Sequence, residues 1–284
     1  MKKEITRDQK KKLFQSTNKQ ALEAIKKLQE GGKIKSVGTN RNYLAALKHI
    51  AKHTTGNLRD LTNEQATQYL VDRCIEVGQK SLEMSRQVMQ HLLNEKLPLI
   101  KTEKKETSRA RGGYTPEQVT FIAQHQNERN ALATKLSYAA GLRAHELLTL
   151  RPVKEQTPSI RPSDSLKFSH RDGQIYTVVG NGGLIREVLI PNELAQQLEQ
   201  RKLNEPVKVT DRSIYYQQHY NVAGGKNWSA SFSKTSSRVL GWSRGGHGLR
   251  HSYAQERMKE ITKIEYERAL KIVSQEMGHY NNLG

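Results

Sequence analysis

Residues 101–113, KTEKKETSRARGG, divide the sequence into two parts with different hydrophobic patterns. This stretch is basic, contains no large apolar residue and ends in two glycines, which is typical of a linker between domains. Before it, apolar residues recur at helical spacing, whereas residues 166–190 alternate with a period of two. The sequence therefore predicts a helical domain over residues 1–100, a basic linker over 101–113 and a second domain over 114–284.

The hydrophobic patterns of the two domains together predict a mainly α fold with one small antiparallel sheet, which belongs to the α+β class. In the first domain we expect four helices. The first ends at Gly31-Gly32, and the others begin near Thr39, after Thr62 or Asn63, either of which could be the N-cap, and near Lys80.

In the second domain, Thr115 is expected to cap a helix whose first residue is Pro116. Three antiparallel strands are expected next, over residues 167–171, 174–180 and 184–191. The first two strands would be joined by a tight turn at Asp172-Gly173. Helical spacing returns over residues 249–277.

Charge is the strongest signal in the composition. Lys and Arg total 47 against 28 Asp and Glu, a net charge of +19. Because neutralising phosphates releases condensed counterions, this excess favours a nucleic-acid partner over a membrane surface. A single cysteine, Cys74, excludes an intrachain disulfide or a cysteine-cluster zinc site. No uncharged apolar stretch is long enough to predict a membrane span.

Three short segments carry residue types suited to phosphate chemistry: residues 140–148 (AGLRAHELL), 247–254 (HGLRHSYA) and 277–279 (MGH). His247 and Arg250 would share a helical face at this spacing. Arg143 and Arg250 come from separate segments, and a planar guanidinium can grip two phosphate oxygens. Taken singly, each segment has a plainer interpretation, a surface arginine or a solvated helix face. No acidic cluster accompanies them, so neither a metal nor another cofactor is expected.

In this order the segments resemble the catalytic boxes of the tyrosine recombinases (phage integrases), GLRxxEL, HxLRHxxA and LGH. The resemblance covers most of the chain, and implies a helical core-binding domain followed by a catalytic domain. It implies that Arg143 and Arg250 clamp the scissile phosphate. His247 would assist proton transfer at the nucleophile, and His279 would hydrogen-bond the phosphate. Glu146 would orient the first arginine.

The sequence departs from the family pattern at two places. A family lysine that protonates the leaving 5′ oxygen aligns with Asn181, whose amide cannot be a general acid; Lys167 or Arg186 would have to substitute. The nucleophilic tyrosine of the family lies about nine residues after the histidine that matches His279, which is beyond Gly284. We therefore expect the chain as given to bind DNA and hold a scissile phosphate without cutting it.

Several residues around these boxes are also assigned an expected role. Four basic residues are expected to contact DNA: Lys101, Lys104, Lys105 and Arg186. Three others are expected to have structural roles, namely His145, His251 and Trp242.

The resemblance implies a site-specific recombinase that cuts and rejoins duplex DNA through a 3′-phosphotyrosyl intermediate. Four copies would act on two DNA sites, with the two domains of each copy clamping the duplex, in the cytoplasm and associated with the nucleoid. One alternative is a DNA-binding architectural or regulatory protein of the same fold that does not cut. Another is a type IB topoisomerase, which would relax supercoiled plasmid without site preference.

Overall fold

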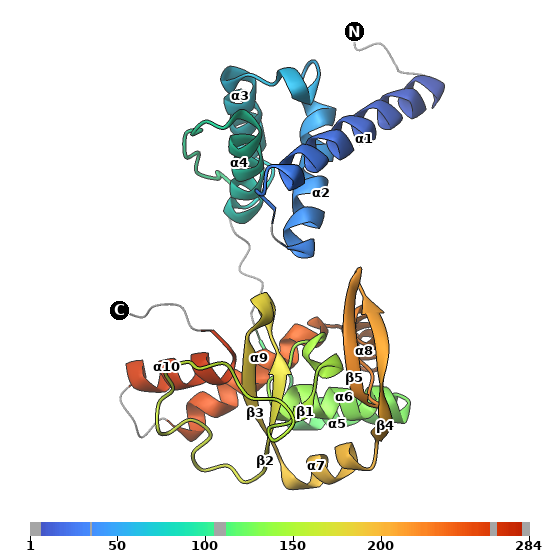
Figure 1. Ribbon diagram of the computed structural model, residues 1–284, viewed down its shortest axis with the longest axis vertical. Coiled ribbons are helices and arrows are strands. Elements are labelled where there is room, and N and C mark those ends of the chain that lie inside the picture. Colours follow the sequence, from blue (N-terminus) through green and yellow to red (C-terminus); the bar gives the residue numbers. More distant parts are fainter. Residues whose placement is uncertain (1–6, 35, 105–111, 262–265, 280–284) are drawn as a thin grey trace. The chain divides into compact units, whose positions relative to one another are not determined.

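The computed structural model describes residues 7–34, 36–104, 112–261 and 266–279. It divides into two units, Met1–Ser108 and Arg109–Gly284. Figure 1 shows the helices of the first unit and the helices and strands of the second, and each unit has a hydrophobic core of its own. Residues 105–111 of the predicted linker, which include Lys105, lie outside the described residues.

The first unit is helical, as predicted. Its helices are α1 (Arg7–Glu30), α2 (Val37–His53), η1 (Leu58–Asp60), α3 (Asn63–Cys74) and α4 (Gln79–Leu93). The Thr62 hydroxyl accepts from the backbone N–H of Gln65, whose side chain accepts from Thr62 in return, so a capping box begins α3. Helix α2 begins two residues earlier than predicted because Ser36 is its N-cap and accepts from the N–H of Thr39.

Residues that the sequence placed in the linker are bonded to this first unit. The Thr102 hydroxyl donates to the backbone carbonyls of Cys74 at 2.9 Å and Val77 at 2.6 Å. The Lys104 ammonium donates to the carbonyl of Glu76 at 2.7 Å. These contacts tie the chain to the end of α3 as far as Lys104.

The second unit combines six helices and five strands among its described residues. Its longer helices are α5 (Pro116–Gln124), α6 (Glu128–Ala139), α7 (Asn192–Glu199), α8 (Gly225–Leu240), α9 (Gly245–Glu260) and α10 (Tyr266–Glu276), with one-turn helices η2 (Glu146–Leu148) and η3 (Asn181–Gly183). Its strands are β1 (Arg151–Pro152), β2 (Gln174–Val179), β3 (Ile185–Ile190), β4 (Lys202–Asp211) and β5 (Ile214–Tyr220). Apolar residues on one face of β2 and β3, including Val178 and Val188, share a core with α5, α6, α7, α8 and α9, whereas α10 packs in a second, smaller cluster.

The three-stranded antiparallel sheet exists, but its first strand is not the predicted one. The order is β1-β2-β3, with Arg151 opposite Thr177 and Gln174 opposite Ile190. Residues 167–171 form turns instead. Phe168 and His170 have φ angles of 62° and 61°, which a strand does not allow. The prediction of a strand over residues 167–171 was therefore wrong.

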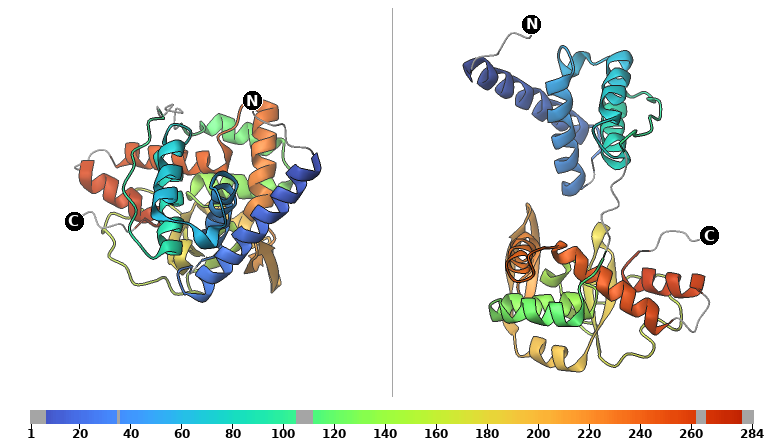
Figure 2. Two further views of the ribbon diagram at one scale, coloured as in Figure 1. Left: turned by 90° about the horizontal axis from the view of Figure 1, so that it is seen from above. Right: turned by 180° about the vertical axis from the view of Figure 1, so that it is seen from behind.

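A second sheet and one long helix were not predicted. Strands β4 and β5 form an antiparallel hairpin that projects from the unit (Figures 1 and 2). Its turn places Arg212 and Ser213 at positive φ, 51° and 66°, where glycine or asparagine is the usual turn signal. Helix α8 then leads into α9, which carries the second box.

Candidate active site

The first box leaves the end of α6 through a tight turn at Gly141, whose φ is +59°. A Cβ atom on Gly141 would lie 2.8 Å from Cδ1 of Tyr253 on α9, so the loop packs directly against that helix. This turn brings Arg143 beside Glu146. The Arg143 Nη1 donates to Glu146 Oε1 at 2.7 Å, and its backbone N–H donates to Oε2 at 2.7 Å.

Glu146 is fully buried and lies among three arginines. Its Oε2 accepts from Arg186 Nη2 at 2.7 Å and lies 3.8 Å from Arg250 Nη1. Burial by itself would raise the pKa of the Glu146 carboxyl, but the arginines, Arg186 foremost, hold that pKa well below its usual range. Glu146 is therefore ionised, and Arg143 shares it with Arg250.

Arg250 projects from α9 and is 3% exposed. It donates to the carbonyl oxygen of Gly141 in the first box and to that of Met277 in the third, the latter at 2.9 Å. Burial lowers the pKa of Arg250 to about 9, with Arg143 also lowering it and Glu146 opposing the shift. One carboxylate among three guanidinium groups leaves positive charge in excess, which favours a bound anion.

Both predicted histidines lie near these arginines. His279 Nε2 is 3.5 Å from Arg143 Nη2, and its backbone N–H donates to the Ser274 carbonyl at 2.9 Å. Burial lowers the pKa of His279, and Arg143 lowers it further. Burial and then Arg250 lower the pKa of His247 in the same way. The structure thus gathers the four residues predicted as catalytic in one place.

The turn between β2 and β3 lies beside this cluster. A Cβ atom on Gly180 would be 3.5 Å from Glu146 Oε1 and 3.9 Å from Arg143 Nη1. The next residue, Asn181, is exposed. Lys167 forms an ion pair of 2.9 Å with Glu187 on β3.

The predicted DNA contacts have different surroundings. Lys101 and Lys104 are exposed on the first unit. Arg186 is 2% exposed, and its guanidinium N–H groups donate to Glu146 and to backbone carbonyls. The prediction that Arg186 contacts DNA was therefore wrong, because its guanidinium points into the core.

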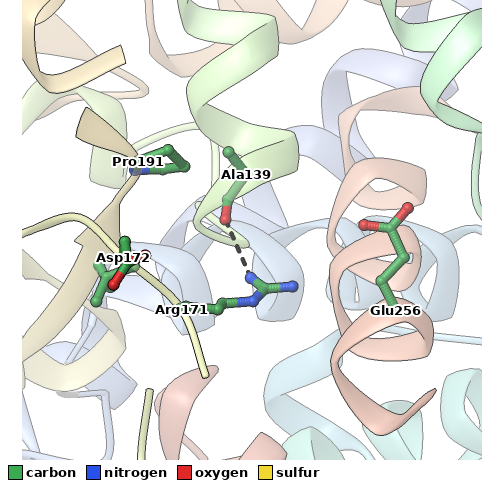
Figure 3. Close-up of a pocket in the computed structure, with 6 residues that line it drawn as sticks. Ala139, Arg171, Asp172, Pro191 and Glu256 are labelled. Atoms are coloured by element: carbon green, nitrogen blue, oxygen red, sulfur yellow. Dashed lines mark hydrogen bonds between the residues drawn. The ribbon is translucent and has the colours of Figure 1, made fainter. Parts of the chain in front are cut away.

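A separate cavity in the second unit is lined by Ala139, Arg171, Asp172, Leu189, Pro191 and Glu256 (Figure 3). Arg171 is already bonded to the carbonyl of Ala139 at 3.5 Å and to both carboxylate oxygens of Glu260 at 2.7 Å. The basic group of this cavity is thus occupied, and none of the four catalytic candidates lines it.

Within the described ranges, no three His, Cys, Asp or Glu side chains are grouped so as to hold a metal ion. None of the helices in that part of the chain is long and apolar enough to cross a membrane.

No protein-family model matches the sequence, and no curated protein matches it either. Solved structures do match its fold. The integrase of transposon Tn1549, solved with circular intermediate DNA, is 13% identical with a TM-score of 0.58, and the match covers 92% of each chain. A lambda integrase dimer bound to a core site is 16% identical with a TM-score of 0.57, over 92% of this chain and 91% of that one.

XerH site-specific recombinase bound to its difH substrate is 17% identical with a TM-score of 0.52, over 85% of this chain and 72% of that one. All three are tyrosine recombinases. Identities this low establish architecture rather than activity. On that evidence, the chain has the fold of the tyrosine recombinases.

Proposed function

We propose that this chain carries the phosphate-binding residues of a site-specific DNA recombinase, an enzyme that cuts and rejoins duplex DNA through a 3′-phosphotyrosyl intermediate. The observation that carries the proposal is the pair Arg143 and Arg250, which come from separate segments and share the buried carboxylate of Glu146. Together with Arg186 they leave positive charge in excess around one carboxylate, which favours a bound anion. A scissile phosphate supplies that anion.

In the proposed reaction, a tyrosine oxygen attacks the phosphorus while the bond from phosphorus to the 5′ oxygen breaks. The 5′ oxygen takes up a proton and leaves, and the tyrosine loses its proton to a base, for which His247 is proposed. Arg250 uses two of its five N–H donors on carbonyl groups and its Nη1 also lies near Glu146, and we assign its remaining donors to phosphate oxygens. Arg143 and His279 approach the same phosphate, and their charge and donors stabilise the pentacoordinate transition state.

The proton for the 5′ oxygen needs a donor other than Asn181. Arg186 is excluded from this role by its burial against Glu146. Lys167 therefore stays the proposed acid, and it must first exchange its ion pair with Glu187 for a contact with DNA.

The three structural relatives named above were solved with DNA. We extend this to the present chain, whose net charge is +19. We propose that both units contact one duplex, with Lys101, Lys104 and Lys105 close to its backbone, and that four copies act on two sites. This would take place in the cytoplasm at the nucleoid.

A covalent trap tests the proposal. The natural full-length protein is incubated with a library of nicked duplexes, in which the fragment beyond the nick diffuses away after cleavage and leaves the covalent complex behind. We expect a discrete DNA sequence to be recovered on the protein, and its loss on Arg250→Ala. Binding without any covalent product would overturn the recombinase proposal.

That outcome would favour the alternative, a DNA-binding architectural or regulatory protein of the same fold. The observation that supports the alternative is Asn181, an exposed amide at the turn where the family resemblance implies a lysine. An Asn181→Lys variant separates the two functions, because it should raise the rate of trapping in a recombinase and change nothing in a protein that only binds.

A further inference from the structure

Arg186 reaches from β3 into the interior of the second unit and contacts two of the three boxes. Its guanidinium lies against Glu146 with two contacts, Nη2 to Oε2 at 2.7 Å and Nε to Oε1 at 3.3 Å. Its Nη1 donates to the carbonyl of Glu276 at 2.6 Å, and Nη2 lies 3.5 Å from the carbonyl oxygen of Gly141. Arg186 therefore links the first box to the end of α10, where the third box begins.

The third box is folded around the stem of the Arg186 side chain. Gly278 has a φ of +72°, and a Cβ atom there would lie 2.6 Å from Arg186 Cδ. The arginine itself is fixed by its strand, because Arg186 pairs with Val178 in the ladder between β2 and β3. A rigid strand thus supports a loop that carries His279.

We infer that Arg186 is a positioning residue, which fixes Glu146 and the end of α10 so that Arg143, Arg250 and His279 face one phosphate. The inference rests on the proposed function and adds a residue that never touches DNA.

The charges support this role. Arg186 and Glu146 are 1% and 0% exposed in their side chains and form an ion pair of 2.7 Å. Glu146 also accepts from Arg143 at 2.7 Å and lies 3.8 Å from Arg250, so one carboxylate is shared by three guanidinium groups and a net positive charge remains. Without Arg186, the whole carboxylate charge would fall on Arg143 and Arg250 and would compete more strongly with the phosphate for them.

Inorganic sulfate serves as the probe, because it is a tetrahedral dianion that does not titrate near neutral pH. It is titrated at constant ionic strength while the imidazole NMR signals of His247 and His279 are followed. Arg186→Lys keeps the charge but cannot bridge Glu146 and Glu276. We expect sulfate affinity to fall about tenfold, the typical effect of losing one hydrogen bond to a charged group.

Arg171→Lys is the matched control, because it also breaks a two-oxygen ion pair, with Glu260, and its hydrogen bonds go to Glu260 and Ala139 rather than to Glu146. It should bind sulfate as the wild type does. A double-mutant cycle then separates positioning from general loosening of the fold. In a Glu146→Gln background, the effect of Arg186→Lys on sulfate affinity should shrink to the part that acts through the end of α10, because its route to Arg143 and Arg250 is gone.

If Arg186→Lys does not fold, the double variant Glu146→Gln with Arg186→Met replaces it. This double variant leaves the net charge unchanged, and it should also bind sulfate about tenfold more weakly than the wild type. Wild-type affinity in Arg186→Lys or in this double variant overturns the positioning role, as does a full Arg186→Lys effect in the Glu146→Gln background. If sulfate does not shift the His247 and His279 signals of the wild type, the site binds no tetrahedral anion. That result would contradict the proposed function itself rather than the positioning role of Arg186.

Discussion

Arg250 on α9 donates through Nη2 to the backbone carbonyl of Met277 at 2.9 Å. One residue of the second box is thereby bonded to the backbone of the third box. The same guanidinium also donates to Gly141 in the first box. Arg250 thus belongs to the proposed phosphate clamp and to the scaffold that joins the three boxes.

Replacing Arg250 should damage chemistry far more than DNA binding. Arg250→Ala removes a donor to the transition state, and such a loss typically lowers a rate by about 10² to 10³. In the proposed complex, binding rests on many phosphate contacts, so the dissociation constant for DNA should change by less than about tenfold. Trapping rate and DNA affinity are measured on the same preparation. Arg238→Ala is the control, because Arg238 lies on α8 and donates to the carbonyl of His125. Equal losses in rate and in binding for Arg250→Ala would contradict the catalytic role.

Much of the fold was predictable because local signals agree with the tertiary structure. Thr62 and Thr115 begin helices as expected from their capping chemistry. The error at residues 167–171 has a tertiary cause. The Phe168 backbone N–H donates to the buried carboxylate of Glu276, more than 100 residues away, and this contact favours a turn at positive φ. A pattern of alternating residues contains no information about that partner.

The residues of the candidate site could be predicted from the sequence, but the hydrogen bonds and ion pairs that connect them could not. Arg143, His247, Arg250 and His279 do meet, whereas the role of Arg186 was missed although a signal existed. Strand β3 buries every second residue, and Arg186 falls on that buried face. The charge of Arg186 favours the DNA-facing surface. Its position in the alternation of buried and exposed residues along the strand predicts a buried side chain instead.

Gly141 should tolerate alanine much less well than Gly182 does, although both have positive φ, +59° and +71°. At Gly182 a Cβ atom meets nothing within 4 Å, so Gly182→Ala should lower the free energy of unfolding only through backbone strain, by about 1 kcal/mol. At Gly141 the added atom also collides with Tyr253, and overpacking adds about 1 to 3 kcal/mol. Urea unfolding of the two variants measures the difference, and similar losses would show that the loop moves freely away from α9.

The first unit should lose stability on mild acidification because of His49. Arg73 Nη1 can only donate, so its contact of 2.7 Å requires a neutral His49 that accepts at Nε2. Burial, and then Arg73, lower the pKa of His49 to about 4 from 6.5. The unfolded chain therefore binds this proton first, so the contribution is complete above pH 6.5 and is lost as the pH falls towards 4.

An NMR titration of the imidazole checks this prediction. In the wild type the His49 signal should remain that of the neutral ring down to about pH 5. Arg73→Met removes one of the causes and should move the midpoint upward, although burial keeps it below 6.5. A wild-type midpoint near 6.5 would show that the contact with Arg73 does not form in solution.

Glu276 should be among the most costly carboxylates to neutralise in the second unit. It is 1% exposed and accepts from Arg257 Nε at 3.0 Å and from the Tyr253 hydroxyl at 2.7 Å. Glu276→Gln leaves Arg257, itself fully buried, without its closest buried counter-charge, and breaking a buried pair in this way costs about 3 kcal/mol. Glu260→Gln removes the other partner of Arg257 and also the partner of Arg171, but that carboxylate is 37% exposed, so only about 1 kcal/mol is expected for each lost pair. Urea unfolding at pH 7 compares the two variants, and an equal loss would mean that water already reaches Arg257.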